Sequence, residues 1–449
     1  MKQHLFAVLA LLSLFLVTGC GSEDGFTPQP APAGLMRIIN TIPDSPALTA
    51  DYENQRIGTV NFGGASIFIQ VLPEVTRPLK FSFVSNGVLT LLTSREVRVE
   101  VDHFVTAIIT GTMAAPEIII IDDAPPEFDE TTTIAELGFM HGAANVTSAV
   151  DFHMTAGDAP AGAPLTTLDA NTASSLIPFE SASNSRLRVF TSGNTAPLWD
   201  SGSFSIAART RPLYVLLDYF GPGEAIVRSV VISVTGSATF PEEGLPGAVS
   251  FSNMISDRGP VDIYLDDVLR AEDLLFGDVG DYIELAGGSY TYKLTTADLI
   301  DDVIIESPIT VSNGEFGTVT ATGVDESNTR LVTIDDLRRV AIRSLLSTVH
   351  AAPSLGEIDL YVLSPGDTVD DNFPTLTQLT FPSSANVGLV EGTYDLFITQ
   401  SATKTIVLGP ERISLDANGL YRINLADAIG GGEPAQIILG YDFDPEFNP

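Results

Sequence analysis

The sequence has a single cysteine, Cys20, among its 449 residues. One cysteine cannot form an intrachain disulfide, so a disulfide-stabilised scaffold is excluded. Basic residues are also scarce, because 22 Lys and Arg stand against 57 Asp and Glu and the formal net charge is −35. A surface this acidic repels phosphate backbones, so nucleic acid is not expected as a partner.

The sequence also lacks the short motifs of the common catalytic classes. It contains no G-x-S-x-G, no H-E-x-x-H, no G-x-x-x-x-G-K-[ST] and no dinucleotide-binding glycine fingerprint. We therefore predict that the protein is not an enzyme, with no catalytic residues, no cofactor and no metal ligands. A carboxylate-only active site is the one enzymatic alternative that remains open.

No apolar run is long enough to span a membrane as a helix, which takes about 20 residues. The longest follows Lys2 and extends over Leu5–Val17, the length of the apolar region of a signal peptide. It is followed by Thr18-Gly19-Cys20, in which small residues precede the cysteine. This stretch resembles the bacterial lipobox. The resemblance implies that residues 1–19 are a lipoprotein signal peptide and that Cys20 is lipidated.

The residues after Cys20 fit a protein held at a membrane by lipid. Residues 20–34 are polar and rich in Gly and Pro, which is typical of a flexible tether. Gly21 replaces the aspartate that would imply retention at the inner membrane, so the resemblance implies the outer membrane. We predict a lipid-anchored protein of the cell envelope, with its body on the periplasmic or the exterior side.

After the tether the sequence contains four copies of one repeat. Each copy has an opening strand and turn, an aspartate at the start of the next strand, and later a turn into a strand such as Tyr290-Thr291-Tyr292-Lys293-Leu294. These strands alternate apolar and polar residues, which indicates half-buried β-strands. The aspartates recur at domain-sized intervals of roughly 100 residues, at Asp51, Asp151, Asp262 and Asp359.

Many short strands with frequent turns and no convincing helical periodicity predict an all-β protein. We expect four tandem Ig-like antiparallel β-sandwich domains. Their expected bounds are 35–126, 134–240, 247–337 and 340–445.

Two copies carry a pattern known from tandem bacterial repeats. The third has Val261-Asp262-Ile263-Tyr264-Leu265-Asp266-Asp267, then Phe276-Gly277, then Leu285-Ala286-Gly287-Gly288-Ser289-Tyr290. The fourth has Val349-His350-Ala351-Ala352-Pro353 and Ile358-Asp359-Leu360-Tyr361-Val362. These stretches resemble the bacterial domain of unknown function 4397. The resemblance implies an exported or surface-attached protein with Ig-like sandwiches, and it implies no activity and no site residues.

Acidic side chains are the main candidates for a binding site. Carboxylate oxygens are ligands that calcium prefers, yet none of the acidic clusters follows a calcium-loop pattern, so we expect solvated turns. For the four repeated aspartates we favour a structural role, in which the carboxylate accepts N–H bonds from the preceding turn. The clusters are Asp122-Asp123, Asp266-Asp267, Asp301-Asp302, Asp370-Asp371 and Asp442-Phe443-Asp444-Pro445-Glu446.

Histidines and aromatic residues offer weaker candidates. His141 and His350 both end the first strand of their copies, which favours a hydrogen bond to the adjacent turn over metal or acid–base work. Trp199 is the only tryptophan, although sugar-binding sandwiches usually need open aromatic platforms. Tyr290 and Tyr292 lie on one face of a strand and are expected in the core.

The sequence predicts a non-enzymatic lipoprotein that acts as a structural, adhesive or protein-binding module of the cell envelope. A calcium- or glycan-binding surface protein is the alternative. The expected partners are the membrane, through the N-terminal lipid, and envelope proteins or glycans. Function specific to this chain should lie where the copies differ, chiefly the insertion at 155–168, the acidic linkers and the outward faces.

Overall fold

The computed structural model describes residues 32–85, 87–240, 242, 244–335 and 338–440. This part of the chain contains β-strands and two short 3-10 helices, η1 (Pro353–Leu355) and η2 (Val369–Asp371), and no α-helix. The all-β prediction is therefore confirmed. No helix among these residues has the length and apolar character to cross a membrane. By their contacts, Ala33–Pro449 form one compact unit.

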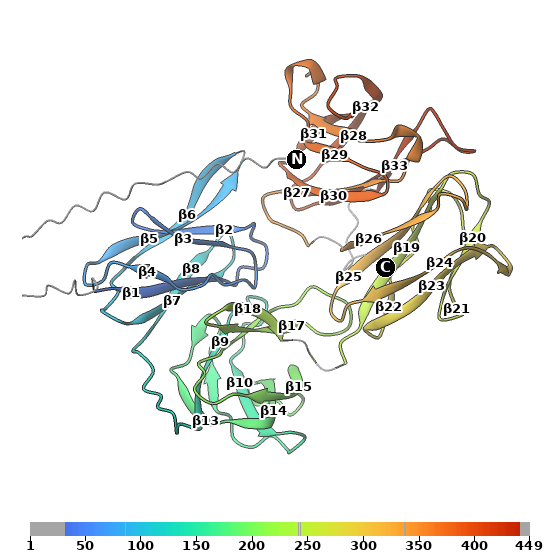
Figure 1. Cartoon of the computed structure of the whole chain (residues 1–449). Helices are drawn as coiled ribbons and strands as arrows, with labels where there is room; N and C mark the ends of the chain where they lie inside the picture. Colours follow the sequence, from blue (N-terminus) through green and yellow to red (C-terminus); the bar gives the residue numbers. More distant parts are fainter. Residues whose placement is uncertain (1–31, 86, 241, 243, 336–337, 441–449) are drawn as a thin grey trace, which may run out of the picture. The chain divides into compact units, whose positions relative to one another are not determined.

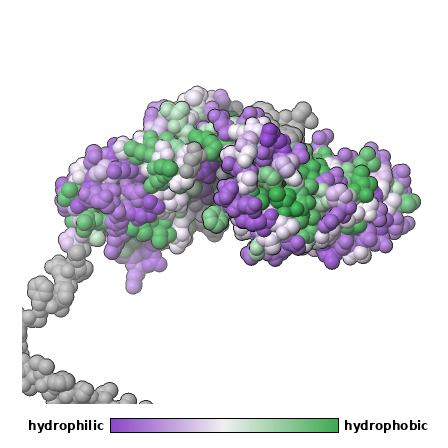
Figure 2. All heavy atoms as spheres, turned by 90° about the horizontal axis from the view of Figure 1, so that it is seen from above, coloured by the Kyte–Doolittle hydropathy of each residue, from purple (hydrophilic) through white to green (hydrophobic). Residues whose placement is uncertain are grey.

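The strands form eight sheets, which stack in four pairs around four buried apolar cores (Figure 1). We call these pairs sandwiches 1 to 4 in chain order. The alternation that predicted them is visible in the burial of individual side chains. Leu79 and Phe81 are fully buried, whereas Lys80 between them is exposed. Hydrophobic and hydrophilic residues are interspersed on the surface (Figure 2).

Sandwich 1 consists of two four-stranded sheets with orders β4-β1-β7-β8 and β3-β2-β5-β6. Its core includes Met36, Ile38, Leu79 and Phe81. The strands are β1 (Gly34–Asn40), β2 (Leu48–Tyr52), β3 (Gln55–Val60), β4 (Ile69–Val71), β5 (Arg77–Ser85), β6 (Val88–Val97), β7 (Phe104–Gly111) and β8 (Pro116–Asp123).

Sandwich 2 departs most from the others. One sheet has the order β11-β10-β14-β15, and the other has the order β12-β9-β16-β17-β18 with β13 also paired to β9. The insertion at 155–168 covers the end of β10, the connection and β11. The strands are β9 (Ile134–His141), β10 (Val150–Ala156), β11 (Thr166–Leu168), β12 (Thr172–Ala173), β13 (Ile177–Glu180), β14 (Ala182–Thr191), β15 (Trp199–Ile206), β16 (Leu213–Asp218), β17 (Val227–Ser233) and β18 (Gly236–Phe240).

Sandwich 3 repeats the strand order of sandwich 1. Its sheets have the orders β22-β19-β25-β26 and β21-β20-β23-β24. The strands are β19 (Gly247–Ile255), β20 (Val261–Leu265), β21 (Val268–Leu274), β22 (Ile283–Leu285), β23 (Gly288–Thr296), β24 (Leu299–Val311), β25 (Phe316–Gly323) and β26 (Arg330–Asp335).

Sandwich 4 has the same order again, with sheets β30-β27-β33-β34 and β29-β28-β31-β32. The order therefore recurs in sandwiches 1, 3 and 4. The strands are β27 (Ser344–His350), β28 (Ile358–Leu363), β29 (Leu376–Leu379), β30 (Ser383–Leu389), β31 (Gly392–Gln400), β32 (Ile406–Leu415), β33 (Leu420–Ala426) and β34 (Gln436–Gly440).

Each sandwich also contains one parallel pair, which the expected antiparallel arrangement did not include. The first strand runs parallel to a strand near the end of the same copy, in the pairs β1 with β7, β9 with β16, β19 with β25 and β27 with β33. Parallel neighbours need a long crossover connection. Here the strands of the other sheet lie within that connection. The parallel pair therefore joins the beginning of each repeat to a strand near its end.

Sandwiches 1 and 2 pack against each other through the outer faces of the sheets that hold β1 and β9. In β1, Ile38 points into the core of sandwich 1, whereas its neighbour Ile39 is buried against sandwich 2. We call this cluster the 1–2 contact. Its buried members are Ile39, Phe62 and Ile108 from sandwich 1 and Met140, Leu213, Val215, Leu217, Val230 and Ile232 from sandwich 2.

Sandwiches 3 and 4 share a smaller contact of the same kind. Met254, Val332 and Ile334 of sandwich 3 are buried against Val349 and Ala351 of sandwich 4. A buried arginine, Arg422 of β33, also donates a hydrogen bond to the hydroxyl of Thr318 in β25 at 3.1 Å. We call this cluster the 3–4 contact.

Candidate functional site

Asp262, the repeated aspartate of sandwich 3, joins the neighbouring strand β21 to the turn after β23. Its side chain is buried in β20, and its two carboxylate oxygens accept the N–H groups of Asp273 and Asp298, both at 2.9 Å. Both donors have positive φ, at 54° and 61°. That backbone conformation is costly for residues with a side chain, so the carboxylate stabilises two strained residues at once, one in β21 and one in the turn after β23.

Asp359 has the same role in sandwich 4. It accepts the N–H of Gln378 at 2.8 Å and the N–H of Ala402 at 3.0 Å, and both donors again have positive φ. The sequence led us to expect donors from the preceding turn, and this detail is wrong. Gln378 lies in the neighbouring strand β29, and Ala402 lies in the turn after β31. Both lie beside the aspartate because β28 is paired on both sides.

The corresponding aspartates of the first two sandwiches make side-chain contacts nearer the surface. Asp51 forms an ion pair with Arg56 at 2.6 Å, with the arginine side chain more than half exposed. Asp151 accepts a hydrogen bond from the hydroxyl of Thr167 at 2.5 Å. The same sequence position therefore serves different contacts in different copies.

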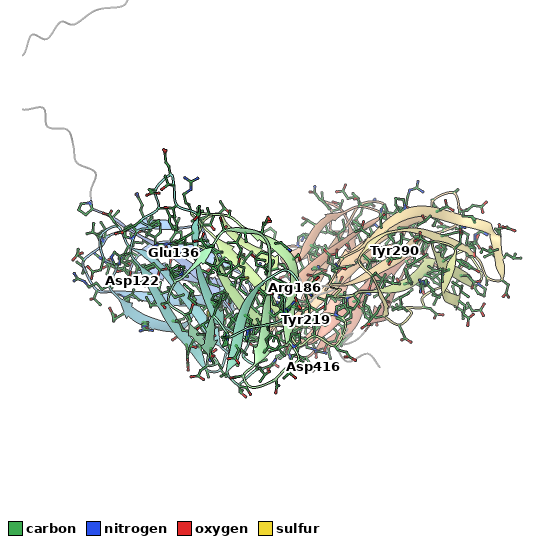
Figure 3. The ribbon with its side chains drawn as sticks, turned by 90° about the horizontal axis from the view of Figure 1, so that it is seen from below. Asp122, Glu136, Arg186, Tyr219, Tyr290 and Asp416 are labelled. Carbon is green, nitrogen blue, oxygen red and sulfur yellow. The ribbon has the colours of Figure 1, made fainter. Side chains whose placement is uncertain are left out.

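The acidic clusters contact nearby protein groups. Among the described residues, no three His, Cys, Asp or Glu side chains gather in a way that could hold a metal ion. The C-terminal cluster at 442–446 lies outside the described residues, as does Cys20. The contacts join Asp122 (Figure 3) to His103, Asp266 to the Thr291 amide, Asp267 to Lys293, Asp302 to Thr296, and Asp371 to Thr368.

His141 and His350 are both fully buried. Their Nε2 atoms lie 3.2 Å from the Ser148 carbonyl and 2.7 Å from the Gly356 carbonyl, respectively. The predicted hydrogen bonds to the adjacent turns are confirmed. Burial lowers the pKa of both imidazoles, which favours their neutral form.

The aromatic candidates are mostly core residues. Trp199 is fully buried, with its ring 5.5 Å from that of Phe240. Tyr292 is fully buried as expected, whereas Tyr290 (Figure 3) is partly exposed and donates its hydroxyl to the Ala286 carbonyl. Neither Trp199 nor Tyr292 can serve as an open platform for a sugar.

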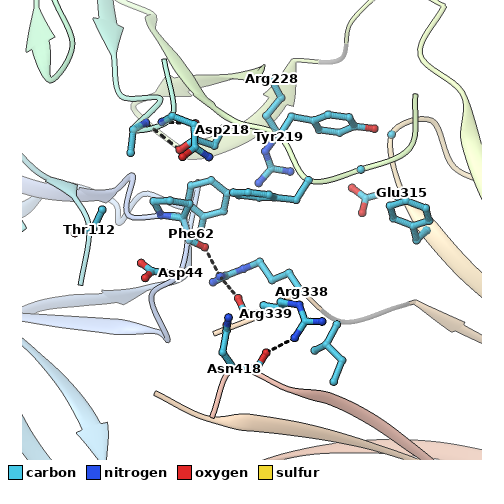
Figure 4. Close-up of a pocket in the computed structure, with 18 residues that line it drawn as sticks. Asp44, Phe62, Thr112, Asp218, Tyr219, Arg228, Glu315, Arg338, Arg339 and Asn418 are labelled. Carbon is cyan, nitrogen blue, oxygen red and sulfur yellow. Dashed lines mark hydrogen bonds between the residues drawn. The ribbon is translucent and has the colours of Figure 1, made fainter. Parts of the chain in front are cut away.

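Residues of all four sandwiches line one cavity of about 410 Å³ (Figure 4). We call it the junction cavity. Its principal side chains are Asp44 and Phe62 from sandwich 1, Asp218, Tyr219 and Arg228 from sandwich 2, Glu315 from sandwich 3, Arg338 and Arg339 from the segment between sandwiches 3 and 4, and Asn418 from sandwich 4.

At the centre of the junction cavity, two arginines approach one phenylalanine ring. The guanidinium carbons of Arg228 and Arg338 lie 5.2 and 5.3 Å from the centre of the Phe62 ring. Arg338 also donates to the carbonyl of Pro43 at 2.5 Å (Figure 4) and to the carbonyl of Ser45 at 2.6 Å. Cation–π contacts of desolvated arginines are stabilising, so these residues join sandwich 1 to its neighbours.

The same segment contacts sandwiches 1 and 4 through its backbone and second arginine. The Ala341 amide donates to the Asp44 carbonyl at 2.9 Å. Arg339 donates to the Asn418 carbonyl at 2.6 Å. The segment continues from sandwich 3 and is hydrogen-bonded to sandwiches 1 and 4, so it joins these three sandwiches.

Charges in the junction cavity balance. Three arginines face three carboxylates, and burial shifts several of these groups toward their neutral forms. Burial lowers the pKa of Arg338 to about 10. Burial raises the pKa of Asp218, although the carboxylate accepts the amides of Ala144 and Asn145. It also raises the pKa of Glu315, against the attraction of Arg228. This chemistry suits a structural joint.

Sequence reasoning did not identify the junction arginines. Arg338 and Arg339 were visible as adjacent basic residues in a strongly acidic chain, inside the shortest connection between two copies. This local positive charge was the one feature of the sequence that could have marked the segment as a contact site. Arg228 lies in an apolar strand, where nothing in the sequence distinguished it.

The comparisons with known proteins give a partial match. Residues 247–361 match the family model described as Domain of unknown function (DUF4397). This match covers sandwich 3 and ends within β28 of sandwich 4. No curated protein is significantly similar to this sequence.

Two solved structures illustrate how distant the structural matches are. The Bacillus anthracis TIE protein is 12% identical, with a TM-score of 0.15 over 92% of this chain and 76% of that chain. A leucine-rich repeat protein from Bacteroides thetaiotaomicron VPI-5482 is 14% identical, with a TM-score of 0.13 over 42% of this chain and 27% of that chain. At these TM-scores, neither protein informs the fold or the function of this one.

Proposed function

We propose that the protein is a lipid-anchored lipoprotein of the bacterial outer membrane, whose β-sandwiches form a non-enzymatic protein-binding module. The lipobox-like stretch ending at Cys20 supports the anchor. The sandwich pairs and the partial family match support the module. The arginines of the junction cavity support a non-enzymatic role, because they donate hydrogen bonds to backbone carbonyls of sandwiches 1 and 4.

The observation that carries the binding role is the apolar surface of the β5–β6 hairpin in sandwich 1. Val84, Val88, Leu89 and Leu91 are between 44% and 64% exposed. Single exposed apolar residues are ordinary, but several on one hairpin mark an interaction site. The Val84 carbonyl accepts a hydrogen bond from Arg343, which ties the hairpin to the start of sandwich 4. The hairpin is thus held in place before any partner binds.

Site-specific photo-crosslinking in intact cells tests this proposal. A photoreactive amino acid at Leu89 or Leu91 is expected to give one and the same protein adduct. At Ser94, an exposed polar position on the same strand, no such adduct should form. With the partner purified, Leu91→Asp should weaken binding about tenfold, because a charge would replace an apolar contact. Adducts that are absent at all three positions, or equal at all three, would contradict the proposal.

A further inference from the structure

A second cavity, of about 600 Å³, lies between sandwiches 1 and 2. Its size falls within the range of small-molecule sites, roughly 300–1,000 Å³. The walls come from β1, β7 and β8, from the connection after β8, and from β15 to β18. We call it the aromatic cavity, after six of its lining residues: Phe68, Phe104, Phe128, Phe204, Tyr214 and Phe240.

Basic side chains outnumber acidic ones at this cavity. Arg37, Arg209 and Arg211 line it, against one carboxylate, Asp123, among the described lining residues. In a chain with 57 acidic and 22 basic residues, this inversion favours an anionic ligand over a neutral or cationic one. Arg211 already forms an ion pair with Glu136. Arg209 is exposed, so Arg37 is the buried cation left for a ligand.

Arg37 is 6% exposed, so its charge is largely removed from water. Its Nε donates to the hydroxyl of Thr106 at 2.9 Å, and one Nη donates to the Ser233 carbonyl at 2.7 Å. Its guanidinium carbon lies 4.5 Å from the centre of the Phe68 ring. Among the described residues it forms no ion pair, and burial lowers its pKa to about 10 despite the attraction of Asp123. A buried guanidinium without a paired anion is costly.

Tyr214 supplies a second polar group at the aromatic cavity. It is 4% exposed, and its ring lies 5.7 Å from those of Phe139 and Phe240. Among the described residues, its hydroxyl has no hydrogen-bond partner, and burial raises its pKa. Buried hydroxyls are normally paired, so this one is available to a ligand.

We propose that the aromatic cavity binds an amphipathic carboxylic acid. The apolar body of the ligand lies against the phenylalanine rings, and its carboxylate pairs with Arg37. The hydroxyl of Tyr214 gives an additional hydrogen bond. A guanidinium binds a carboxylate by two parallel hydrogen bonds, the strong form of this contact. This binding is separate from the protein contact proposed for the β5–β6 hairpin.

Calorimetric titration of the mature chain carrying Cys20→Ser tests the proposal, since no lipid or detergent is then present to compete. Decanoate is expected to bind at one site per chain, with decanol at least about tenfold weaker because it lacks the charge. Decyltrimethylammonium should bind no better than decanol. Arg37→Gln should weaken decanoate about 10- to 100-fold and leave decanol unchanged. Tyr214→Phe should weaken binding severalfold.

Arg422→Gln is the matched control, because Arg422 is an equally buried arginine in the 3–4 contact and does not line the aromatic cavity. It should leave decanoate binding unchanged. If Arg37→Gln lowers the melting temperature more than Arg422→Gln does, its weaker binding could reflect lost stability. Binding of decanoate by Tyr214→Phe is then the test of the cavity. Absence of saturable decanoate binding, equal affinity for decanoate and decanol, or unchanged binding in both cavity variants would overturn the proposal.

Discussion

Val215→Asp is expected to separate sandwich 1 from sandwich 2. Val215 is fully buried in the 1–2 contact, on the outer face of β16. A carboxylate there loses its water while the two sandwiches stay together, at a cost of at least about 3 kcal/mol. Once the sandwiches part, the same carboxylate is on the surface of sandwich 2. The variant should therefore keep its β-structure and open at the contact.

Small-angle scattering and limited proteolysis measure this opening. The radius of gyration should rise, and the connection after β8 should become sensitive to protease. Ser203→Asp adds the same charge at an exposed position of β15 and should change neither property. A Val215→Asp protein with an unchanged radius of gyration would show that sandwiches 1 and 2 are not held by this contact.

Asp262→Ala is expected to destabilise sandwich 3 by about 2–4 kcal/mol, because two backbone N–H groups lose a charged acceptor. Asp273 and Asp298 would also lose the contact that stabilises their positive φ. In calorimetry of the full chain, the transition that contains sandwich 3 should fall by roughly 10 °C. Binding at the β5–β6 hairpin should be unaffected.

Asp51→Ala is the matched control for this prediction. Asp51 occupies the same repeat position but forms an ion pair with a largely exposed arginine. Exposed ion pairs contribute at most about 1 kcal/mol, so the melting temperature should change little. Equal effects of the two substitutions would contradict the role that we assign to Asp262.

The sequence was sufficient to predict the all-β class of fold, because a strand buried on one face alternates apolar and polar residues. β5 shows it, with Leu79 and Phe81 buried on either side of exposed Lys80. β16 does not, since all of its residues from Leu213 to Asp218 are buried. A strand covered on both faces is apolar without alternation. Such runs could have predicted the 1–2 contact, but not which sandwich covers them.

The first and third copies share a Phe-Gly pair, Phe62-Gly63 and Phe276-Gly277, whose glycines have a role in the packing between sandwiches. Gly63 follows Phe62 and has φ of 74°, and a Cβ there would lie 3.2 Å from Arg228 and 3.3 Å from Leu217 of sandwich 2. In sandwich 3, a Cβ at Gly277 would lie 3.6 Å from Ile438 of sandwich 4. Both glycines therefore lie where the next sandwich approaches. This placement depends on long-range packing, which no local pattern encodes.

The candidate sites also differ in whether they depend on local contacts or on long-range packing. Local contacts, such as those of His141 and His350 with adjacent turns, were predictable from position in the repeat. The junction cavity and the aromatic cavity were not, because each combines residues from distant parts of the chain. Arg37 and Ser233, for example, are hydrogen-bonded to each other although they lie 196 positions apart in the sequence.

The mass of the N-terminal peptide, from protein extracted from bacterial membranes, tests the proposed lipid-anchored module most directly. We expect a peptide that begins at Cys20 and carries a diacylglyceryl thioether and an N-acyl chain, and we expect Cys20→Ser protein to leave the membrane fraction. An N-terminal peptide that begins elsewhere, or that carries an unmodified Cys20, would contradict the proposal.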